Sequence, residues 1–536
     1  MMDIDLIREP DWAWIETEEG SSALEKGTAG WRNSDAGLEF GIAGGVLGIS
    51  ISAPRTAVKR IVMRWKHGLR AGGGLQVYGD HWERGYGDLE WRQMVPERVM
   101  PWYAIIHDGA HSFGFGVKTG GRSFSHWRLD RNGVTLVSDI SCGAEGVLLG
   151  SRILPAAEVV QYAGEEGESA HSAANRLCRS LCDTPVMPEQ PIYGGNNWYY
   201  TYGVSSHEEV VADARFISEL AEGLSNRPYM IIDDGWQING NIPEYNGGPW
   251  VGNRKFPDMR GLAEEMSEAG VRPGIWFRPL LTSERVPESW ILKGSADRCL
   301  DPSHPDVLRY VAEDMKTLVQ WGFKLIKHDF STFDLLGEWG FKMGSRPIGS
   351  RHSFSDRSRT TAEIIVDFYR AIADAASDAL VIGCNTIGHL AAGLFAIQRT
   401  GDDTSGKGWE RTRRMGINTL AFRMHQHGAF FSHDADCVAL TSFTPWQESK
   451  QWLELVANSG TPLFLSAKPG SLDAEQTEAV RNAFRIASMP QPAAEPLDWL
   501  RTTCASRWKF GKREAEFDWY GEEGIREEER DSIWWK

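Results

Sequence analysis

The pattern of hydrophobic and polar positions changes near residue 190. Up to about residue 170, short stretches of alternating apolar and polar residues are separated by glycine-rich turns, as in GIAGGVLGISIS and GVTLVSDIS. This spacing is typical of an all-β sandwich, so we expect an N-terminal β-sandwich domain over 1–170. The helical pattern ESAHSAANRLCRSLC and the proline-rich PVMPEQP follow. Because proline cannot continue a helix, 171–190 is expected to be a helical linker.

Beyond residue 190, apolar runs alternate with amphipathic helical segments. The predicted strands are IYGGNNWYY, YMIIDD, RPGIWF, FKLIKHD, ALVIGC, LFAIQRT, GAFFSHD and PLFLS. Eight strands that alternate with helices predict an α/β protein with a catalytic (β/α)8 TIM barrel over 191–480. An open doubly wound sheet is disfavoured, because no glycine-rich phosphate loop follows the first strand.

The last part of the chain, 481–536, predicts a small C-terminal β domain. It contains the β-like stretch SRWKFGKREAEFDWYG and then the acidic run EEGIREEERD. A charge run of this kind is most simply a solvated face.

Composition and charge narrow the functional classes. The 536 residues are 41% hydrophobic and 24% charged, which is ordinary for a globular protein. A formal net charge of −16 without any basic block argues against a nucleic-acid partner. No apolar run approaches the length of a membrane span, the N-terminal residues lack a signal-peptide pattern, and the seven cysteines are scattered. We therefore expect a cytoplasmic location, no membrane partner and no disulfide framework.

The tryptophan content points toward carbohydrate. The chain has 23 Trp but only 13 Tyr. An indole face can stack on the C–H face of a sugar, and its N–H can donate to a hydroxyl. Most of these residues are expected to fill the core, so the composition suggests a sugar ligand without establishing one.

Polar residues end most of the predicted barrel strands, at the rim where barrel enzymes carry their reactive groups. They include Asp233, Asp234, Trp276, Arg278, Lys327, His328, Asp329, Cys384, Asn385, Arg399, Asp402, Asp403, His433, Asp434 and Asp436. Carboxylates beside Lys and Arg are what glycoside hydrolysis requires, since one acts as nucleophile and another protonates the leaving oxygen. Lys327 lies two positions before Asp329, so both side chains face one side of a strand and the cation would keep Asp329 ionised. Asp403 follows Arg399 and is the candidate acid/base.

A metal site is an alternative for this rim. It would use His425 and His427 together with His433, Asp434 and Asp436, whose nitrogen and oxygen atoms suit a divalent ion. A metal hydrolase would not explain the Lys and Arg beside the other carboxylates, and histidines in an apolar helical stretch are more often packing residues. We therefore predict no metal site, and no cofactor, because the carboxylates supply the proton and nucleophile chemistry.

Two smaller alternatives concern single motifs. The pair Asp233 and Asp234 after a strand is also a common helix N-cap arrangement. Cys384 closes an apolar strand, but no histidine is positioned by sequence to activate it, and His389 is near only in sequence. We expect Cys384 to be a small apolar or pocket-lining residue.

Four motifs together resemble a known family. IIDDGWQ, GIWFRP, LDPSHPDVLRYV with WGFKLIKHD, and AIQRTGDDT are similar, in this order, to the barrel motifs of glycoside hydrolase family 36. That family comprises α-galactosidases and relatives and shares a clan with family 27. The resemblance covers most of residues 190–440. It implies that Asp329 is the nucleophile and Asp403 the acid/base, because the family's Arg-x-x-x-Asp spacing from Arg399 selects Asp403 over Asp402.

The resemblance also implies a set of substrate contacts. Asp233 and Asp234 match the pair that binds the 4- and 6-hydroxyls of the sugar. The other matching positions are the cations Lys327 and Arg399, the aromatic residues Trp198 and Trp276, the pocket-lining Cys384, and Trp65, which is expected to reach the pocket from the N-terminal domain. His328 departs from the family pattern, where a larger apolar or aromatic residue is usual.

These implications predict a retaining, exo-acting α-galactosidase that hydrolyses terminal α-galactosides of an oligosaccharide or glycoconjugate through a covalent glycosyl-enzyme. Its two catalytic carboxyl groups should stand about 5–5.5 Å apart. Because IIDDGWQ also resembles the raffinose-synthase branch, a galactosyl-transferring enzyme stays an alternative, as does an α-N-acetylgalactosaminidase or α-glucosidase on the same scaffold. A non-catalytic sugar-binding protein is the alternative from another class. The resemblance leaves a homo-oligomer open.

Overall fold

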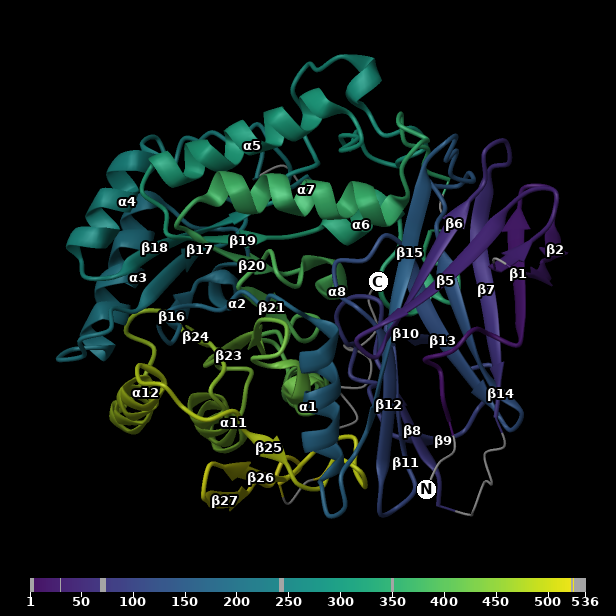
Figure 1. Cartoon of the computed structure of the whole chain (residues 1–536). Helices are drawn as coiled ribbons and strands as arrows, with labels where there is room; N and C mark the ends of the chain where they lie inside the picture. Colours follow the sequence, from purple (N-terminus) through teal and green to yellow (C-terminus); the bar gives the residue numbers. More distant parts are fainter. Residues whose placement is uncertain are drawn as a thin grey trace.

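The chain consists of a strand-rich N-terminal part and a strand-and-helix part beside it (Figure 1). The computed structural model describes residues 4–28, 30–67, 74–240, 245–348, 351–521 and 524. Helix α1 (Ala170–Leu181) lies between the two parts in sequence, where a helix is predicted.

The N-terminal part contains two antiparallel sheets. In order across the first sheet, the strands are β10 (Met100–Pro101), β13 (Phe124–Asp130), β14 (Gly133–Asp139), β7 (Val58–Lys66), β1 (Trp12–Thr17) and β2 (Ser21–Ala23). In the second sheet they are β3 (Glu25–Gly27), β4 (Gly30–Arg32), β5 (Gly37–Ala43), β6 (Val46–Ser52), β15 (Ile153–Ala163), β12 (Ser112–Val117), β11 (Tyr103–His107), β8 (Gln76–Gly79) and β9 (Arg92–Gln93). The ring of Phe115 on β12 packs against that of Trp127 on β13, with centroids 4.9 Å apart. Side chains of the two sheets therefore share one core.

Trp65 does not reach the barrel, contrary to the expectation from the family resemblance. It lies on β7, is fully buried, and donates its Nε1–H to the carbonyl oxygen of Arg8 at 2.9 Å. Its ring centroid is 6.4 Å from that of Trp127. Because strand residues alternate between two faces, the place of Trp65 in the pattern of β7 turns its side chain into the core. The Trp65 ring therefore belongs to the core of the N-terminal part and not to the barrel rim.

The second part contains one parallel sheet of nine strands. In order these are β22 (Ser432–Asp434), β21 (Ile397–Arg399), β20 (Leu380–Gly383), β19 (Leu325–His328), β18 (Arg272–Phe277), β17 (Tyr229–Ile232), β16 (Tyr193–Asn196), β24 (Leu463–Ser466) and β23 (Cys437–Ala439). The two end strands, β22 and β23, are separated in the chain by only Ala435 and Asp436. The sheet therefore curves into a TIM-like barrel whose seventh strand is interrupted. Each of the eight predicted strand segments contributes a strand.

Helices connect these strands on the outside of the barrel. The longer ones are α3 (His207–Leu220), α4 (Met259–Glu268), α5 (Pro305–Gln320), α7 (Thr361–Ala376), α11 (Trp446–Asn458) and α12 (Ala474–Ala487). The shorter ones are α2 (Trp198–Thr201), α6 (Ser331–Leu336), α8 (Gly388–Ala391), α9 (Trp409–Thr412), α10 (Thr419–Arg423), the 3₁₀ turns η1 (Glu288–Trp290), η2 (Gly340–Met343) and η4 (Met424–Gln426), and the π-helical turn η3 (Arg413–Asn418). Local sequence fixes where helices start: Thr360 and Glu363 form a capping box that satisfies free N–H groups at the start of α7.

The C-terminal part forms a small antiparallel sheet of β25 (Glu495–Pro496), β26 (Arg507–Phe510) and β27 (Arg513–Glu516). The predicted boundary at residue 480 falls inside α12, which packs on α11, so the small sheet begins only at β25. The acidic run at 522–531 lies outside the described residues, apart from Gly524. Among the described helices, none is both long and apolar enough to cross a membrane.

One N-terminal segment, residues 80–88, contacts the rim of the barrel and is called the docking segment below. The N–H of Gly85 donates to the carbonyl of Thr400 at 2.9 Å, and its own carbonyl accepts from the N–H of Asp402 at 3.0 Å. These bonds join the docking segment to the chain just after β21. The N-terminal part is therefore positioned directly against the loop that carries the predicted acid/base.

A buried ion pair that holds the docking segment predicts a loss of stability on mutation. Oδ1 of Asp80 accepts from Nε and Nη2 of Arg423 at 3.0 and 2.7 Å, and both side chains are buried. Asp80→Ala leaves the Arg423 charge buried without its carboxylate, so we expect the free energy of unfolding in urea to fall by about 3–5 kcal/mol. The control Glu475→Ala breaks an exposed ion pair with Lys450 and should change it by at most about 0.5 kcal/mol. Equal losses in the two variants would contradict this account.

Candidate active site

Most of the predicted site residues lie at one rim of the barrel. Asp233 directly follows β17, Asp329 follows β19, Cys384 follows β20 and Arg399 ends β21. The carboxyl ends of parallel barrel strands meet at the same rim. The structure therefore brings these side chains to one site, which their contacts define in detail.

Asp329 is fixed by two N–H donors. Its Oδ1 accepts from the backbone N–H of Phe330 at 2.8 Å, and its Oδ2 accepts from the indole N–H of Trp276 at 3.1 Å. Phe330 has a left-handed backbone with φ of 62°, so the chain turns sharply after the strand and returns its N–H to the carboxylate. No Lys or Arg among the described residues forms an ion pair with Asp329, so the two donors leave a carboxylate that is oriented but still chemically available.

Lys327 pairs with Asp233 rather than with Asp329. Its Nζ lies 2.7 Å from Oδ2 of Asp233, which also accepts from Nδ2 of Asn196 at 2.7 Å. Burial is the largest single effect and lowers the pKa of Lys327, but Asp233 and the other anionic groups around it together raise it more, so the net pKa lies well above its usual value. The cation is therefore permanently charged, and Asp329 is among the other carboxylates that it faces. The ion pair of Lys327 is thus made with a residue that follows β17, two strands away from β19, and not with Asp329.

Asp233 and Asp234 are not helix caps. The next long helix, α4, begins at Met259 and is capped by Asp258. Asp234 accepts from Nε2 of Gln237 at 2.7 Å, and the residue as a whole is partly exposed to solvent. Burial of its carboxyl group raises the pKa of Asp234 to about 6, against the lowering effect of Gln237.

Asp402 and Asp403 have different environments. Asp402 is buried between two guanidinium groups, with Nη2 of Arg84 at 3.2 Å and Nη2 of Arg411 at 2.8 Å. The side chain of Asp403 is 31% exposed and lies 3.2 Å from Nη2 of Arg399. Asp402 is thus held as a structural anion, and Asp403 is the one that a ligand can reach.

Cations lower the pKa of Asp403. Burial of the carboxyl group raises the pKa of Asp403. The charges of Arg399, Lys327 and Arg84 together lower it by more, so the net pKa is below its ordinary value. Asp403 is therefore ionised at neutral pH in the unliganded protein.

Cys384 is a neutral packing thiol. Burial raises the pKa of Cys384 well above its usual value, although Arg399 and Lys327 act to lower it. Nη1 of Arg399 contacts its Sγ at 3.3 Å. His389 is engaged elsewhere, with Nε2 2.8 Å from the carbonyl oxygen of Val117. A Cys–His nucleophile is therefore not assembled here.

The two predicted pocket tryptophans are placed differently. Trp276 is 1% exposed and reaches the site through its indole N–H on Asp329, so its ring face is not open to a ligand. Trp198 begins α2 directly after β16 and is partly exposed. Its ring centroid is 5.4 Å from that of Tyr202. Of the two, Trp198 can offer an aromatic face.

His328 faces away from the site, which explains how the chain departs from the family pattern there. Its side chain is fully buried and its Nε2 lies 2.7 Å from Oγ of Ser331. Its ring packs edge-on against Phe368 of α7. Burial lowers the pKa of His328 to about 3. Because neighbours on a strand point to opposite faces, His328 packs under a helix while Lys327 and Asp329 face the rim.

The histidines that follow α10 are packing residues. Nε2 of His425 lies 2.7 Å from the hydroxyl of Tyr103, and Nε2 of His433 lies 3.1 Å from Oε1 of Gln426. Burial lowers the pKa of His427 to about 4. Asp436 is bound by Arg399, Tyr199 and Thr404, and Asp434 is buried beside it. Among the described residues, no group of three or more His, Cys, Asp or Glu side chains is arranged to hold a metal ion.

Sequence reasoning missed two residues of the docking segment. Arg84 reaches Asp402, and Oε2 of Glu83 accepts from Nδ2 of Asn385 at the end of β20. Both side chains are buried although both are charged. The signal in the sequence is DHWERGYGD, a glycine-containing loop dense in charged and aromatic residues. This segment, and not Trp65, is what the N-terminal part contributes to the rim.

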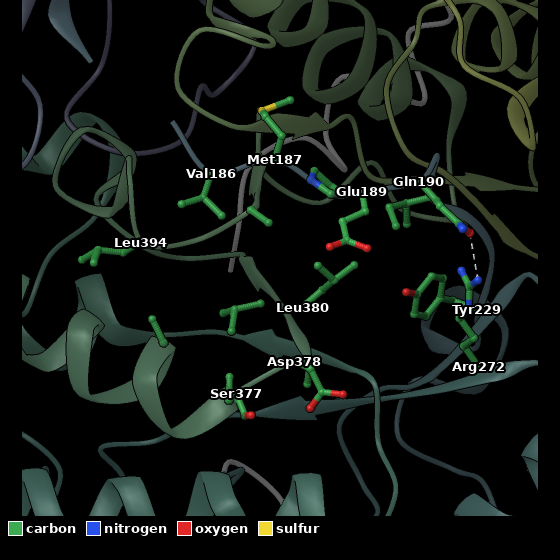
Figure 2. Close-up of a pocket in the computed structure, with 17 residues that line it drawn as sticks. Val186, Met187, Glu189, Gln190, Tyr229, Arg272, Ser377, Asp378, Leu380 and Leu394 are labelled. Atoms are coloured by element: carbon green, nitrogen blue, oxygen red, sulfur yellow. Dashed lines mark hydrogen bonds between the residues drawn. The ribbon is translucent and has the colours of Figure 1, made fainter. Parts of the chain in front are cut away.

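A large cavity lies at the opposite end of the barrel (Figure 2). Its volume is about 510 Å³, and its lining includes Tyr229, Arg272 and Leu380, which are the first residues of β17, β18 and β20. Catalytic groups of barrels sit at the carboxyl ends of strands, so this cavity is not a candidate for the chemistry.

Comparisons with known proteins agree with the sequence motifs and the fold. No protein-family model matches the chain. The sequence is 29% identical over 189 residues to the α-galactosidase AgaA of Geobacillus stearothermophilus. This matched region covers 33% of this chain and 24% of that protein. The matched region thus spans about a quarter of the length of that relative.

Solved structures match nearly the whole chain. An α-galactosidase from Thermus thermophilus, TtGalA, solved with p-nitrophenyl α-D-galactopyranoside, superposes with a TM-score of 0.59 at 16% identity and covers 94% of this chain and 99% of that one. A variant of the family 36 α-galactosidase AgaA from Geobacillus stearothermophilus, solved with raffinose, gives a TM-score of 0.62 at 15% identity and covers 94% and 79%. At these identities the structural likeness establishes the fold. In its motifs, its matched sequence region and its fold, the chain is similar to the α-galactosidases of glycoside hydrolase family 36.

Proposed function

We propose that the protein is a retaining, exo-acting α-galactosidase with Asp329 as nucleophile and Asp403 as acid/base. The contrast between these two carboxylates carries the proposal. Asp329 is oriented by two N–H donors, whereas Asp403 is more exposed and lies beside the guanidinium of Arg399. The relatives named above, α-galactosidases solved with galactosides, support the same activity.

The mechanism needs only these two groups. A carboxylate oxygen of Asp329 attacks the anomeric carbon while Asp403 gives its proton to the leaving oxygen, so the glycosidic bond breaks and a glycosyl ester forms. Asp403 then takes a proton from water, whose oxygen attacks the same carbon and releases Asp329. Two inversions at one carbon keep the α configuration.

The electrostatics of Asp403 affect the two half-reactions differently. The cations that lower its pKa favour the ionised form, which is the form that deprotonates water. In the first half-reaction Asp403 must carry a proton, and its lowered pKa then makes it a stronger acid toward the leaving oxygen.

Recognition of galactose is assigned to the residues that follow β16 and β17. Asp233, whose Oδ2 is held by Lys327 and Asn196, and Asp234 beside it are the acceptors for the 4- and 6-hydroxyls. Trp198 follows β16, the strand that pairs with β17, and offers a partly exposed ring. Buried acceptors that a misplaced hydroxyl would leave unpaired discriminate strongly between epimers.

The division of the chain follows from the same proposal. We assign a β-sandwich domain to 1–170, a helical linker to 171–190, the catalytic barrel to 191–487 and a small β domain to the remainder. Placing the last boundary after α12 rather than at 480 keeps that helix with the barrel, since α12 packs on α11.

A panel of p-nitrophenyl α- and β-glycosides, assayed with EDTA, tests the activity. We expect release from the α-galactoside, and at least about a thousandfold lower kcat in Asp329→Asn, because the amide cannot form the glycosyl ester. Galactose binding and the melting temperature of Asp329→Asn should stay near those of the wild type. Release from another α-glycoside alone would move the specificity, transfer to a sugar acceptor in preference to water would indicate a transferase, and silence with retained galactose binding would indicate a sugar-binding protein.

Leaving-group dependence tests the acid role of Asp403. Asp403→Asn cannot donate a proton, so kcat/KM should fall far more for raffinose than for α-D-galactopyranosyl fluoride, whose leaving group needs little protonation. The matched variant Asp402→Asn removes a carboxylate held by Arg84 and Arg411 and should lower both rates by similar factors. A stronger leaving-group dependence in Asp402→Asn than in Asp403→Asn would reverse the assignment.

A further inference from the structure

We propose that Trp339 and Arg84 form a platform that binds the first sugar ring of the leaving group, so that oligosaccharides are the preferred substrate class. This inference rests on the proposed function, because it uses Asp403 to mark the leaving-group side. It concerns two residues, one in the loop after α6 and one in the docking segment, that neither the sequence motifs nor the galactose site includes.

Aromatic side chains lead outward from the nucleophile. The ring of Trp276, whose N–H binds Asp329, has its centroid 6.3 Å from that of Phe330. The ring centroid of Trp339 lies 5.7 Å from that of Phe330 and 5.2 Å from that of Phe333. Unlike Trp276, Trp339 is partly exposed. A flat apolar surface is therefore present one step away from the nucleophile.

The docking segment fixes the loop that carries Trp339. The indole N–H of Trp82 donates to the carbonyl of Gly344 at 2.8 Å, and Oε1 of Glu83 accepts from the N–H of Gly340 at 3.1 Å. Two ends of the same short loop are thus tied to neighbouring residues of the N-terminal part. A ring whose following backbone is anchored at two points can bind a ligand with little further loss of conformational freedom.

Arg84 places this ring on the leaving-group side. Its guanidinium carbon lies 5.5 Å from the ring centroid of Trp339, and its Nη2 lies 3.2 Å from Oδ1 of Asp402. Asp402 immediately precedes Asp403, which must lie beside the leaving oxygen to protonate it. Arg84 therefore bridges the loop of the acid/base and the ring of Trp339.

The chemistry of the platform suits a second sugar ring. An indole stacks on the C–H face of a pyranose, whereas a small alcohol offers no such face. The Nε–H of Arg84 is buried and makes no hydrogen bond among the described residues, and Oε2 of Glu83 stands 3.9 Å away. A buried donor without a partner costs free energy, so a sugar hydroxyl that accepts from it would be favoured.

Raffinose and α-D-galactopyranosyl fluoride separate the platform from the chemical step, because the fluoride has no leaving-group ring. In Trp339→Ala we expect the ratio of kcat/KM for raffinose to that for the fluoride to fall about tenfold, the size of a lost aromatic stacking contact. Trp339→Phe keeps a flat ring and should restore most of the ratio. The control Trp12→Ala removes an exposed tryptophan on β1, remote from the rim, and should keep the wild-type ratio.

Each outcome decides the proposal. An unchanged ratio in Trp339→Ala, or equal ratios in Trp339→Ala and Trp339→Phe, would overturn the platform while leaving the proposed function intact. Should Trp339→Ala melt well below Trp12→Ala, Trp339→Leu replaces it, because leucine keeps apolar volume without a flat ring. A wild type that cleaves neither substrate would refute the proposed function, and the platform with it.

Discussion

The buried guanidinium of Arg399 is the interaction on which the site depends. It is 1% exposed and lies 3.2 Å from Asp403, 3.0 Å from Asp436 and 3.3 Å from the sulfur of Cys384. A buried cation is tolerated only when partners surround it, because an unpaired charge away from water is very costly. Those partners follow β20, β21 and β22, so one charge fixes three strand ends relative to one another. The exposed carboxylate of Asp403 is held in place by this constraint.

The docking segment adds a second constraint from outside the barrel. Its backbone pairs with the chain on both sides of Gly401, and its Asp80 binds Arg423. The N-terminal part is therefore a structural component of the rim. Through the charge of Arg84 it also contributes to the lowered pKa of Asp403. The interrupted seventh strand beside Asp436 belongs to the same arrangement, since Asp436 has a left-handed backbone with φ of 69° and accepts from Arg399.

The barrel and its rim residues were predictable from sequence, because strands of a parallel barrel are short apolar runs and the residues that end them meet at one rim. Asp233, Asp329 and Arg399 are found there for that reason. The partner of Lys327 was not predictable, since alternation along β19 says nothing of Asp233, which follows β17 two strands away. The prediction that Trp65 reaches the pocket was wrong, because a family likeness does not fix which tryptophan of an antiparallel sheet faces outward. Arg84 was missed because its contact with Asp402 spans two parts of the chain that no local pattern connects.

Trapping the glycosyl-enzyme tests the central claim most directly. A fluorinated galactosyl fluoride, whose ring fluorine slows hydrolysis of the intermediate, would be incubated with the wild type, and the labelled peptide would be found by digestion and mass spectrometry. The account predicts one galactosyl adduct per chain, attached to Asp329 and absent from Asp329→Asn. An adduct on another carboxylate, or turnover of galactosides without any adduct, would contradict it.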